Sequence, residues 1–286
     1  GEEAVLVRAT AADPAVEVRM TYRLDAHGVL TVDTTLTSTA DDAAPPLDVG
    51  AVRVLLPLPA RAAEVLDLGG RWVRERAPQR HPLLEGTWSR TGRRGRTGHD
   101  ATLLMCGGTT GFGFRHGEVW AAHVGWSGNH EHLVERLAEG AGAHASVLGG
   151  GEALAPGEVR LAPGESYRAP TVWFVHSASG LDGVTNALLA HQRAQPGYRT
   201  TPRPLVLNTW EAVYFDHDLD RLARLADVAA DVGVERFVLD DGWFGARRDD
   251  HRGLGDWQVS EEVWPQGLGP LVDHVRGLGM EFGLWF

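Results

Sequence analysis

The sequence contains no lysine, so its 27 positively charged side chains are all arginine. They are outnumbered by 38 aspartate and glutamate residues, which gives a formal net charge of -11 at pH 7. An acidic balance disfavours nucleic acid or an anionic membrane surface as the main partner. No apolar run approaches the roughly 20 residues of a membrane span. We therefore expect a protein that binds neither nucleic acid nor a membrane.

Cysteine is almost as scarce, because Cys106 is the only one and an intramolecular disulfide is excluded. It follows the apolar residues Leu103-Leu104-Met105, which favours a buried and inert side chain. A lone cysteine fits a reducing compartment, and we expect the cytoplasm. The chain begins at Gly1 rather than at methionine and shows no signal peptide. Its N-terminus therefore looks trimmed, and a targeting segment could precede it.

The 286 residues, 43% of them hydrophobic, suggest about two domains. Residues 1–180 contain short alternating stretches separated by glycine and proline, which is typical of an antiparallel β-sandwich. A helix at 181–194 and a proline-bearing stretch that ends at Pro204 form an expected linker, 181–204. A Gly/Ala-rich loop with a hairpin is expected at 139–151. Strands are expected at 16–22, 30–36, 52–58, 102–104, 111–114, 119–124, 145–148, 158–161 and 171–175.

Residues 205–286 change to a β-α-β-α-β rhythm. Short apolar stretches at 205–207, 236–239 and 281–284 predict strands, and helical spacing of apolar residues predicts helices at 218–232 and 268–278. Asp218 can cap the first of these helices, and Gly233 stands where that helix should end. Such an alternation requires a parallel sheet with right-handed crossovers.

Side chains suited to binding follow each of these three strands. Trp210 follows the first strand, Asp240 and Asp241 the second, and Trp285 the third. Parallel strands end at one edge of a sheet and lie about 4.8 Å apart, so the outer two ends should be roughly 10 Å apart. One sugar ring is of similar width. Carboxylates accept hydrogen bonds from vicinal hydroxyls and indoles stack on C–H surfaces, so the pattern predicts a carbohydrate site.

Other interpretations of the same residues stay open. Each tryptophan could belong to the core, and the acids could be solvated, cap a helix or hold a divalent metal. We expect no metal and no cofactor, because no His-rich ligand set, glycine-rich phosphate loop or GxSxG motif accompanies them. The two acids are poorly placed to be the catalytic pair of a retaining glycosidase. Such carboxyls face the scissile bond from opposite sides, about 5–5.5 Å apart.

Two polar groups in the N-terminal half are ambiguous. An arginine-rich segment could bind an anion, or it could be a solvated loop that pairs with the chain's acids. Three histidines could hold a metal but lack a recognisable ligand spacing, so ordinary polar roles are favoured. These residues are Arg90, Arg93, Arg94 and Arg96, and His123, His130 and His132.

Several stretches closely resemble the glycoside hydrolase family 36 α-galactosidases. In the C-terminal part they are LVLNTWEAVYFD (205–216), VERFVLDDGWFGARRDD (234–250), LGDWQV (254–259) and LGMEFGLWF (278–286). In the N-terminal part they are GRWVRER (70–76), SRTGRRGRTGHD (89–100), GWSGNHE (125–131) and LAPGESYRAPTVWFVHS (161–177). The resemblance spans nearly the whole chain, and LDDGWFG is its most specific motif.

The resemblance implies a β-supersandwich followed by the first three β/α units of a (β/α)8 TIM barrel, truncated after strand three. It implies hydrolysis of terminal α-galactose with retention, from substrates such as melibiose, raffinose and stachyose. Asp240, Asp241, Trp210 and Trp285 would bind the galactose. The family's nucleophile and acid/base follow barrel strands four and six, so we expect no catalytic residue in this chain and no activity from it alone.

The resemblance also implies that the full-length protein is a homo-oligomer. Three alternatives stay open. The protein could be an α-N-acetylgalactosaminidase, or it could transfer galactose as raffinose synthases do. It could also be a non-catalytic sugar-binding protein that uses the sandwich.

Overall fold

The computed structural model describes residues 3–101, 104–138, 145–198 and 201–286. The chain divides into two compact units, Gly1–Tyr198 and Arg199–Phe286. None of the helices in these described ranges is long and apolar enough to cross a membrane.

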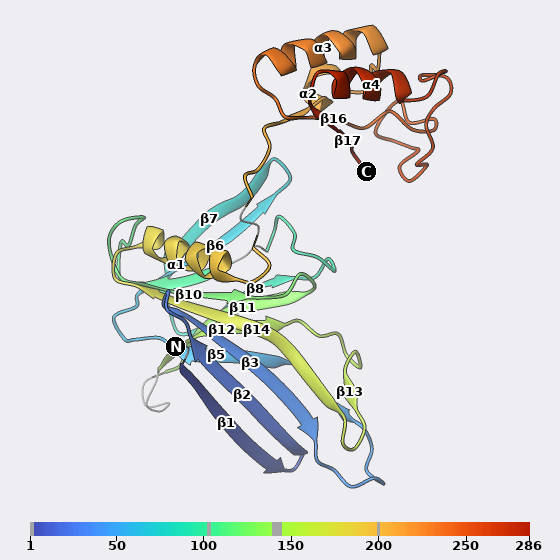
Figure 1. The fold of residues 1–286 in the computed structure, drawn as a ribbon. Helices are drawn as coiled ribbons and strands as arrows, with labels where there is room; N and C mark the ends of the chain where they lie inside the picture. The colour runs from blue at the N-terminus through green and yellow to red at the C-terminus, as the bar shows by residue number, and fades with distance from the viewer. Residues whose placement is uncertain (1–2, 102–103, 139–144, 199–200) are drawn as a thin grey trace. The chain divides into compact units, whose positions relative to one another are not determined.

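The first unit is built from antiparallel sheets, as predicted (Figure 1). Its eight-stranded sheet runs, in spatial order, through β1 (Glu3–Ala12), β2 (Ala15–Leu24), β3 (Val29–Ser38), β14 (Ser166–Ser177), β10 (Val119–Val124), β9 (Met105–Gly108), β6 (Glu64–Arg71) and β7 (Arg74–Pro82). A four-stranded sheet contains β5 (Val52–Pro57), β12 (Ser146–Glu152), β11 (His130–Arg136) and β8 (Gly86–Gly92). A short pair joins β13 (Arg160–Leu161) to β4 (Leu47–Asp48).

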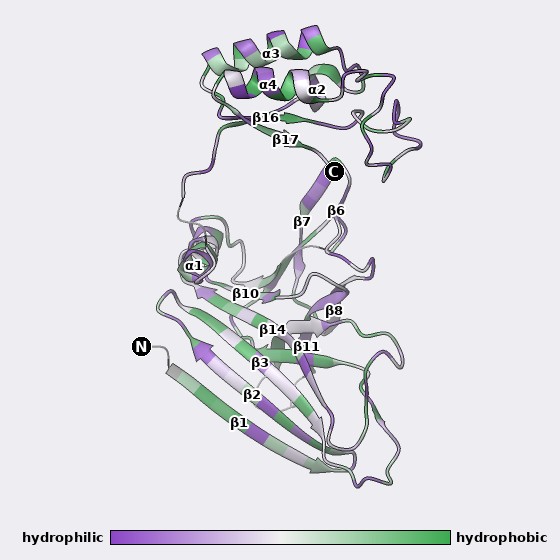
Figure 2. Cartoon of the chain, turned by 45° about the vertical axis from the view of Figure 1, so that its right-hand side comes forward, coloured by the Kyte–Doolittle hydropathy of each residue, from purple (hydrophilic) through white to green (hydrophobic). Residues whose placement is uncertain are grey.

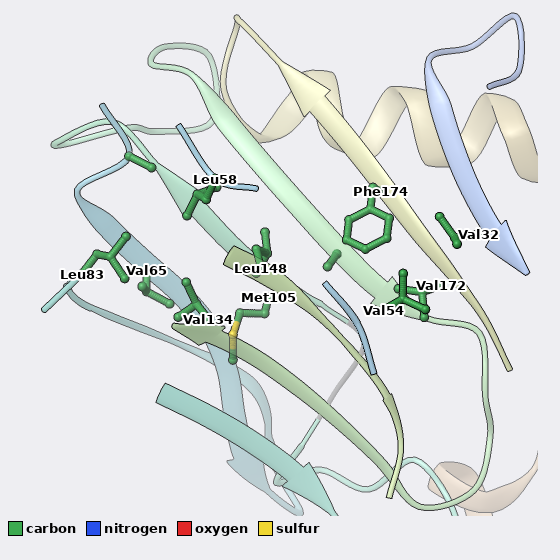
Figure 3. Close-up of a cluster of buried hydrophobic side chains, with 12 residues drawn as sticks. Val32, Val54, Leu58, Val65, Leu83, Met105, Val134, Leu148, Val172 and Phe174 are labelled. Atoms are coloured by element: carbon green, nitrogen blue, oxygen red, sulfur yellow. The ribbon is translucent and has the colours of Figure 1, made fainter. Parts of the chain in front are cut away.

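The two larger sheets pack face to face around one apolar core, which makes this unit a sandwich (Figure 3). Val32 and Val172 from the larger sheet and Val134 from the smaller one have no exposed surface. Each buried aliphatic side chain of this kind contributes about 1.5–3 kcal/mol relative to exposure. On the eight-stranded sheet, helix α1 (Leu181–Ala194) buries Val184 in a second cluster with Phe112 and Val119. The predicted helix at 181–194 is confirmed.

The strand predicted at 145–148 is confirmed as the start of β12 (Ser146–Glu152), but this strand continues through the glycines that were predicted to lie in a loop. Residues 139–144 of the predicted loop lie outside the described ranges. Strand β12 lies between β5 and β11 and carries three consecutive glycines, Gly149 to Gly151. A Cβ atom at Gly150 would lie 2.1 Å from the carbonyl oxygen of Glu131. The glycines are therefore needed for close approach of the neighbouring strands rather than for a loop.

Other strand predictions in this unit were partly wrong. Residues 111–114 form a turn because Gly111 has φ +71 and Phe112 donates its N–H to the Thr109 carbonyl. The strand expected at 158–161 is confined to β13, and most of 102–104 lies outside the described residues. Strands β1, β4, β6, β7, β8, β9 and β11 were not predicted. Strand β7, for example, is polar and largely exposed and shows no apolar alternation.

The second unit has the predicted β-α-β-α-β order. Its strands are parallel, and β16 (Arg236–Leu239) lies between β15 (Val206–Asn208) and β17 (Glu281–Leu284). The helices are α2 (Trp210–Val213), α3 (Leu219–Asp231) and α4 (Gly269–Gly277). Asp218 caps α3 by accepting a hydrogen bond from the Arg221 backbone N–H at 2.8 Å, and Gly233 after it has φ +85. The short helix α2 was not predicted.

Helices α3 and α4 pack on one face of this parallel sheet (Figure 1). Phe237 and Leu239 of β16 are fully buried under Leu222 and Leu271 of the two helices. Purple and green bands along α3 in Figure 2 show the amphipathic pattern that directs this packing. The other face carries the Arg236–Glu281 ion pair beside Val206, which is 46% exposed. Burial on one face thus fixes which side chains point away from the helices.

Candidate functional site

The three strand ends predicted to form a site are neighbours at one edge of the parallel sheet. The Thr209 N–H donates to the carbonyl of Val238 at 3.0 Å, and the Trp285 N–H donates to the carbonyl of Leu239 at 3.0 Å. Strand β16 is central, so its end lies between those of β15 and β17. Asp240 and Asp241 therefore start from the middle of this edge.

Asp240 is held in place by the residues that follow β15. Its backbone N–H donates to the Thr209 hydroxyl at 3.0 Å, and the Asn208 side-chain amide donates to its carboxylate. Asn208 also accepts a hydrogen bond from the Trp210 N–H at 2.8 Å, so it ties Trp210 to Asp240. Only 7% of Asp240 is exposed. A carboxylate oxygen has two lone pairs, so this fixed group can still accept hydrogen bonds from a ligand.

Asp241 forms a buried ion pair with Arg247, which was not predicted from the sequence. Arg247 donates from Nε to Asp241 Oδ1 at 3.0 Å and from Nη2 to Oδ2 at 2.8 Å. Its Nη1 donates to the Arg252 carbonyl at 2.9 Å, and its guanidinium lies 5.6 Å from the Phe215 ring centroid. Asp241 is 5% exposed and Arg247 6%. The hydrogen bonds to Asp241 raise the pKa of Arg247, so the guanidinium remains charged.

The two predicted indoles lie at opposite ends of the edge and pack against different rings. Trp210 makes edge-to-face contacts with Tyr214 at 5.2 Å and Phe215 at 5.0 Å. Trp285 lies 6.2 Å from the Trp257 centroid, and its carbonyl accepts a hydrogen bond from Trp243 at 3.0 Å. Both indoles are half-buried, so each has surface left for a ligand. That these two indoles, Asp240 and Asp241 bind one sugar ring together stays a prediction.

His217 is a further buried group behind the acids. It is 9% exposed, and neither ring nitrogen has a hydrogen-bond partner within the described residues. Its ring lies 5.9 Å from that of Trp264, and a Cβ atom on Gly242 would lie 3.5 Å from it. Burial, together with the nearby Arg248 cation, lowers the pKa of His217 to about 4. The Tyr214 backbone, Asp240 and Asp241 act in the opposite direction and raise this pKa, but by less. The imidazole is therefore neutral near pH 7.

We expect His217 to make the protein less stable as the pH falls from about 6.5 to about 4. In this window the unfolded chain binds a proton at His217 and the folded protein does not. The free energy of unfolding should fall by up to roughly 3 kcal/mol. His217→Phe should remove this loss, which urea denaturation at pH 7 and pH 4 can measure. His251→Phe, on a well-exposed side chain, is the control; equal losses in His217→Phe and the unmodified protein would contradict the prediction.

Three of the ambiguous polar side chains, those of His130, His132 and Arg90, have partners within the protein. The imidazole of His132 accepts a hydrogen bond from the Val124 N–H at 3.1 Å, and burial lowers its pKa to about 3. The ring nitrogens of His130 face the carbonyls of Gly128 and Ala101. Arg90 binds the buried carboxylate of Asp67 at 2.8 Å instead of facing solvent. Within the described ranges, no cluster of three His, Cys, Asp or Glu residues could hold a metal ion.

Comparison with known proteins assigns the chain to a family. The model of the "Glycosyl hydrolase family 36 N-terminal domain" matches residues 1–162. The chain belongs to glycosyl hydrolase family 36. The "Melibiase" model matches residues 166–286 of this family 36 chain. The match at both ends confirms the resemblance seen in the sequence.

Relatives of this family 36 chain include an α-galactosidase of Escherichia coli, 38% identical over 98% of this chain and 39% of the relative. The crystal structure of α-galactosidase AgaA from Geobacillus stearothermophilus matches with a TM-score of 0.84 and 30% identity. A variant of AgaA in complex with raffinose matches with a TM-score of 0.85 and 30% identity. Each AgaA match covers 99% of this chain and 39% of AgaA. The family 36 chain thus spans about two fifths of these relatives, as an N-terminal sheet domain and the start of a catalytic domain.

Proposed function

We propose that the whole protein containing this chain is an α-galactosidase that hydrolyses terminal α-galactose with retention. The supporting observation is the fixed acidic residue Asp240 at the end of the central parallel strand of a family 36 chain. Its substrates would be galacto-oligosaccharides such as melibiose, raffinose and stachyose. The raffinose complex of the AgaA variant supports this substrate class.

In the proposed architecture, residues 1–180 are a β-supersandwich and 181–204 a helix and linker. Residues 205–286 are the first three β/α units of a (β/α)8 barrel. The parallel strands and the apolar Val206 on the sheet face away from the helices support a barrel, because later strands would cover that face. The nucleophile and the acid/base would follow later strands, so this chain supplies binding residues and no catalytic ones. A homo-oligomer and a cytoplasmic location are also proposed.

Asp240, Asp241, Trp210 and Trp285 are proposed to bind galactose. Asp240 would accept hydrogen bonds from sugar hydroxyls, since its backbone contacts with Thr209 fix its position. Asp241 would do so with the oxygen lone pairs that Arg247 leaves free. The indoles would cover the apolar face of the ring from the two outer strand ends.

The test is turnover by the full-length protein. It should release 4-nitrophenol from 4-nitrophenyl α-galactoside and leave 4-nitrophenyl β-galactoside intact. From melibiose it should release galactose first as the α-anomer, as retention requires. Comparison with 4-nitrophenyl α-N-acetylgalactosaminide, and analysis of products for transferred galactose, separate the two alternative enzymes. The chain 1–286 alone should be inactive. Galactose binding without turnover of any of these substrates would support a non-catalytic sugar-binding protein and overturn the proposal.

A further inference from the structure

The sandwich contains an apolar hollow between its two larger sheets. The eight-stranded sheet contributes Leu30, Trp120 and Phe174 to the wall, and the four-stranded sheet contributes Leu56 and Leu148. Leu148 and Phe174 are labelled in Figure 3. All the residues that line the hollow belong to the first unit of the chain. The hollow is therefore a feature of the sandwich alone.

The size and the lining of the hollow suit an apolar ring. Its volume is about 210 Å³. An apolar cavity of about 150 Å³ that is lined by leucine, isoleucine and phenylalanine stays dry and binds benzene. Leu148 and Phe174 in the wall are only 2% and 7% exposed. One ring, or two fused rings, would fit and would replace contact with water by contact with these side chains.

The aromatic part of the wall favours an aromatic ligand over an alkyl chain. The rings of Trp120 and His176 stack at a centroid distance of 5.5 Å and an interplanar angle of 28°. Both rings line the hollow, as does Phe174. Aromatic pairs in offset or edge-to-face contact gain about 0.5–1.5 kcal/mol beyond the area that they bury. A ligand ring among these three side chains can make such contacts.

His176 offers one hydrogen-bond acceptor to a ligand. Its Nε2 lies 2.8 Å from Oε1 of Glu118, and Arg61 binds the same carboxylate through Nε at 2.5 Å. The hydrogen bond from Arg61 lowers the pKa of Glu118 to about 2, so this carboxylate is ionised and Nε2 of His176 donates to it. No hydrogen bond joins Nδ1 to another of the described residues. In a neutral imidazole Nδ1 is then an acceptor.

The mouth of the hollow is fixed before any ligand binds. Leu24 and Gly28 line it on either side of the turn from β2 to β3. Within this turn Asp25 accepts hydrogen bonds from the backbone N–H groups of His27 and Val29, each at 2.8 Å. The same carboxylate lies 2.7 Å from Nδ1 of His191 on α1. A preformed mouth loses little entropy when a ligand enters.

We propose that this hollow binds a small neutral aromatic molecule that carries one N–H or O–H donor. The ring would pack between Leu56 and Phe174, and the donor would bond to Nδ1 of His176. A sugar is disfavoured because its hydroxyls would face leucines without partners. Arg61 and Glu118 balance each other's charge beside His176, so a charged ligand gains nothing there. The proposal does not depend on α-galactosidase activity.

The test uses indole as the probe and the full-length protein, with binding measured by saturation-transfer difference NMR. The signal should saturate with a Kd of about 1 mM or lower. Leu56→Trp should weaken binding by about tenfold or more, because the new side chain fills the hollow. Leu55→Trp adds the same ring on the opposite face of β5 and should leave binding unchanged. His176→Phe keeps an aromatic ring without the acceptor and should weaken binding several-fold.

The variants also define the results that would overturn the site. A cooperative thermal unfolding transition shows that Leu56→Trp is folded; if it is not, Leu30→Phe from the facing sheet takes its place. Absence of a saturable signal from the unmodified protein would mean that no such ligand binds. Equal binding of indole by the filled variant and by Leu55→Trp would place the probe elsewhere. Equal binding by His176→Phe and the unmodified protein would contradict the predicted class of ligand.

Discussion

Arg247→Met is expected to destabilise the protein by about 3–5 kcal/mol. The substitution leaves the buried Asp241 carboxylate without the guanidinium that binds both its oxygens. It also removes the hydrogen bond to the Arg252 carbonyl. An unpaired buried charge costs far more than the methionine side chain can regain by packing. Denaturation of the chain in guanidinium chloride, monitored by tryptophan fluorescence, measures the change in the free energy of unfolding.

The control and the double variant isolate the ion pair. Arg224→Met replaces an exposed arginine on α3 and should change the free energy of unfolding by at most about 0.5 kcal/mol. Adding Asp241→Leu to Arg247→Met removes both charges and should recover part of the lost stability. If Arg247→Met unfolded no more easily than Arg224→Met, the buried pair would not exist as described.

Asp240→Ala is expected to raise the KM of the full-length protein for α-galactosides about 100-fold. Hydrogen bonds to a charged acceptor contribute about 1.5–3 kcal/mol each, and the Asn208 amide would also lose its acceptor. Inhibition by free galactose should weaken by a similar factor, because the lost contacts are to the sugar. Steady-state kinetics and galactose inhibition together measure the effect.

The matched control for this substitution is Asp231→Ala, an exposed aspartate at the end of α3. It should leave KM and galactose inhibition unchanged. Galactose binding that survived Asp240→Ala would place the sugar elsewhere, as expected if the sandwich were the binding domain.

The second unit could be predicted from sequence because local patterns agree with its packing. In α3, apolar spacing, the Asp218 cap and Gly233 all indicate the same helix, and its apolar side chains do pack on the sheet. The sandwich was harder to predict. Strand β7 is polar, and the second half of β12 is glycine-rich, so neither stretch shows alternation. They are strands because neighbouring strands pair with them. Tertiary pairing overrides local propensity there.

The candidate site, too, could be predicted only in part from the sequence. Strand ends could be read from the sequence, and they brought Asp240, Asp241, Trp210 and Trp285 to one sheet edge. The partners of the acids depend on loop geometry, which spacing alone does not give. Asn208 at the end of β15 donates a hydrogen bond to Asp240, which follows the adjacent strand β16. Arg247 reaches Asp241 only because the loop turns at Gly242, which has φ +108. One signal for Arg247 was present, because a carboxylate that becomes buried needs a cation or hydrogen-bond donors as partners, and Arg247 is close to Asp241 in the sequence.

A crystal structure of the full-length protein with bound galactose most directly tests whether this sheet edge is the sugar site. It should place an Asp240 oxygen about 2.5–3 Å from a galactose hydroxyl, between Trp210 and Trp285, with Arg247 still on Asp241. Galactose bound away from the ends of β15, β16 and β17, with Asp240 contacting only Asn208 and the backbone, would contradict it.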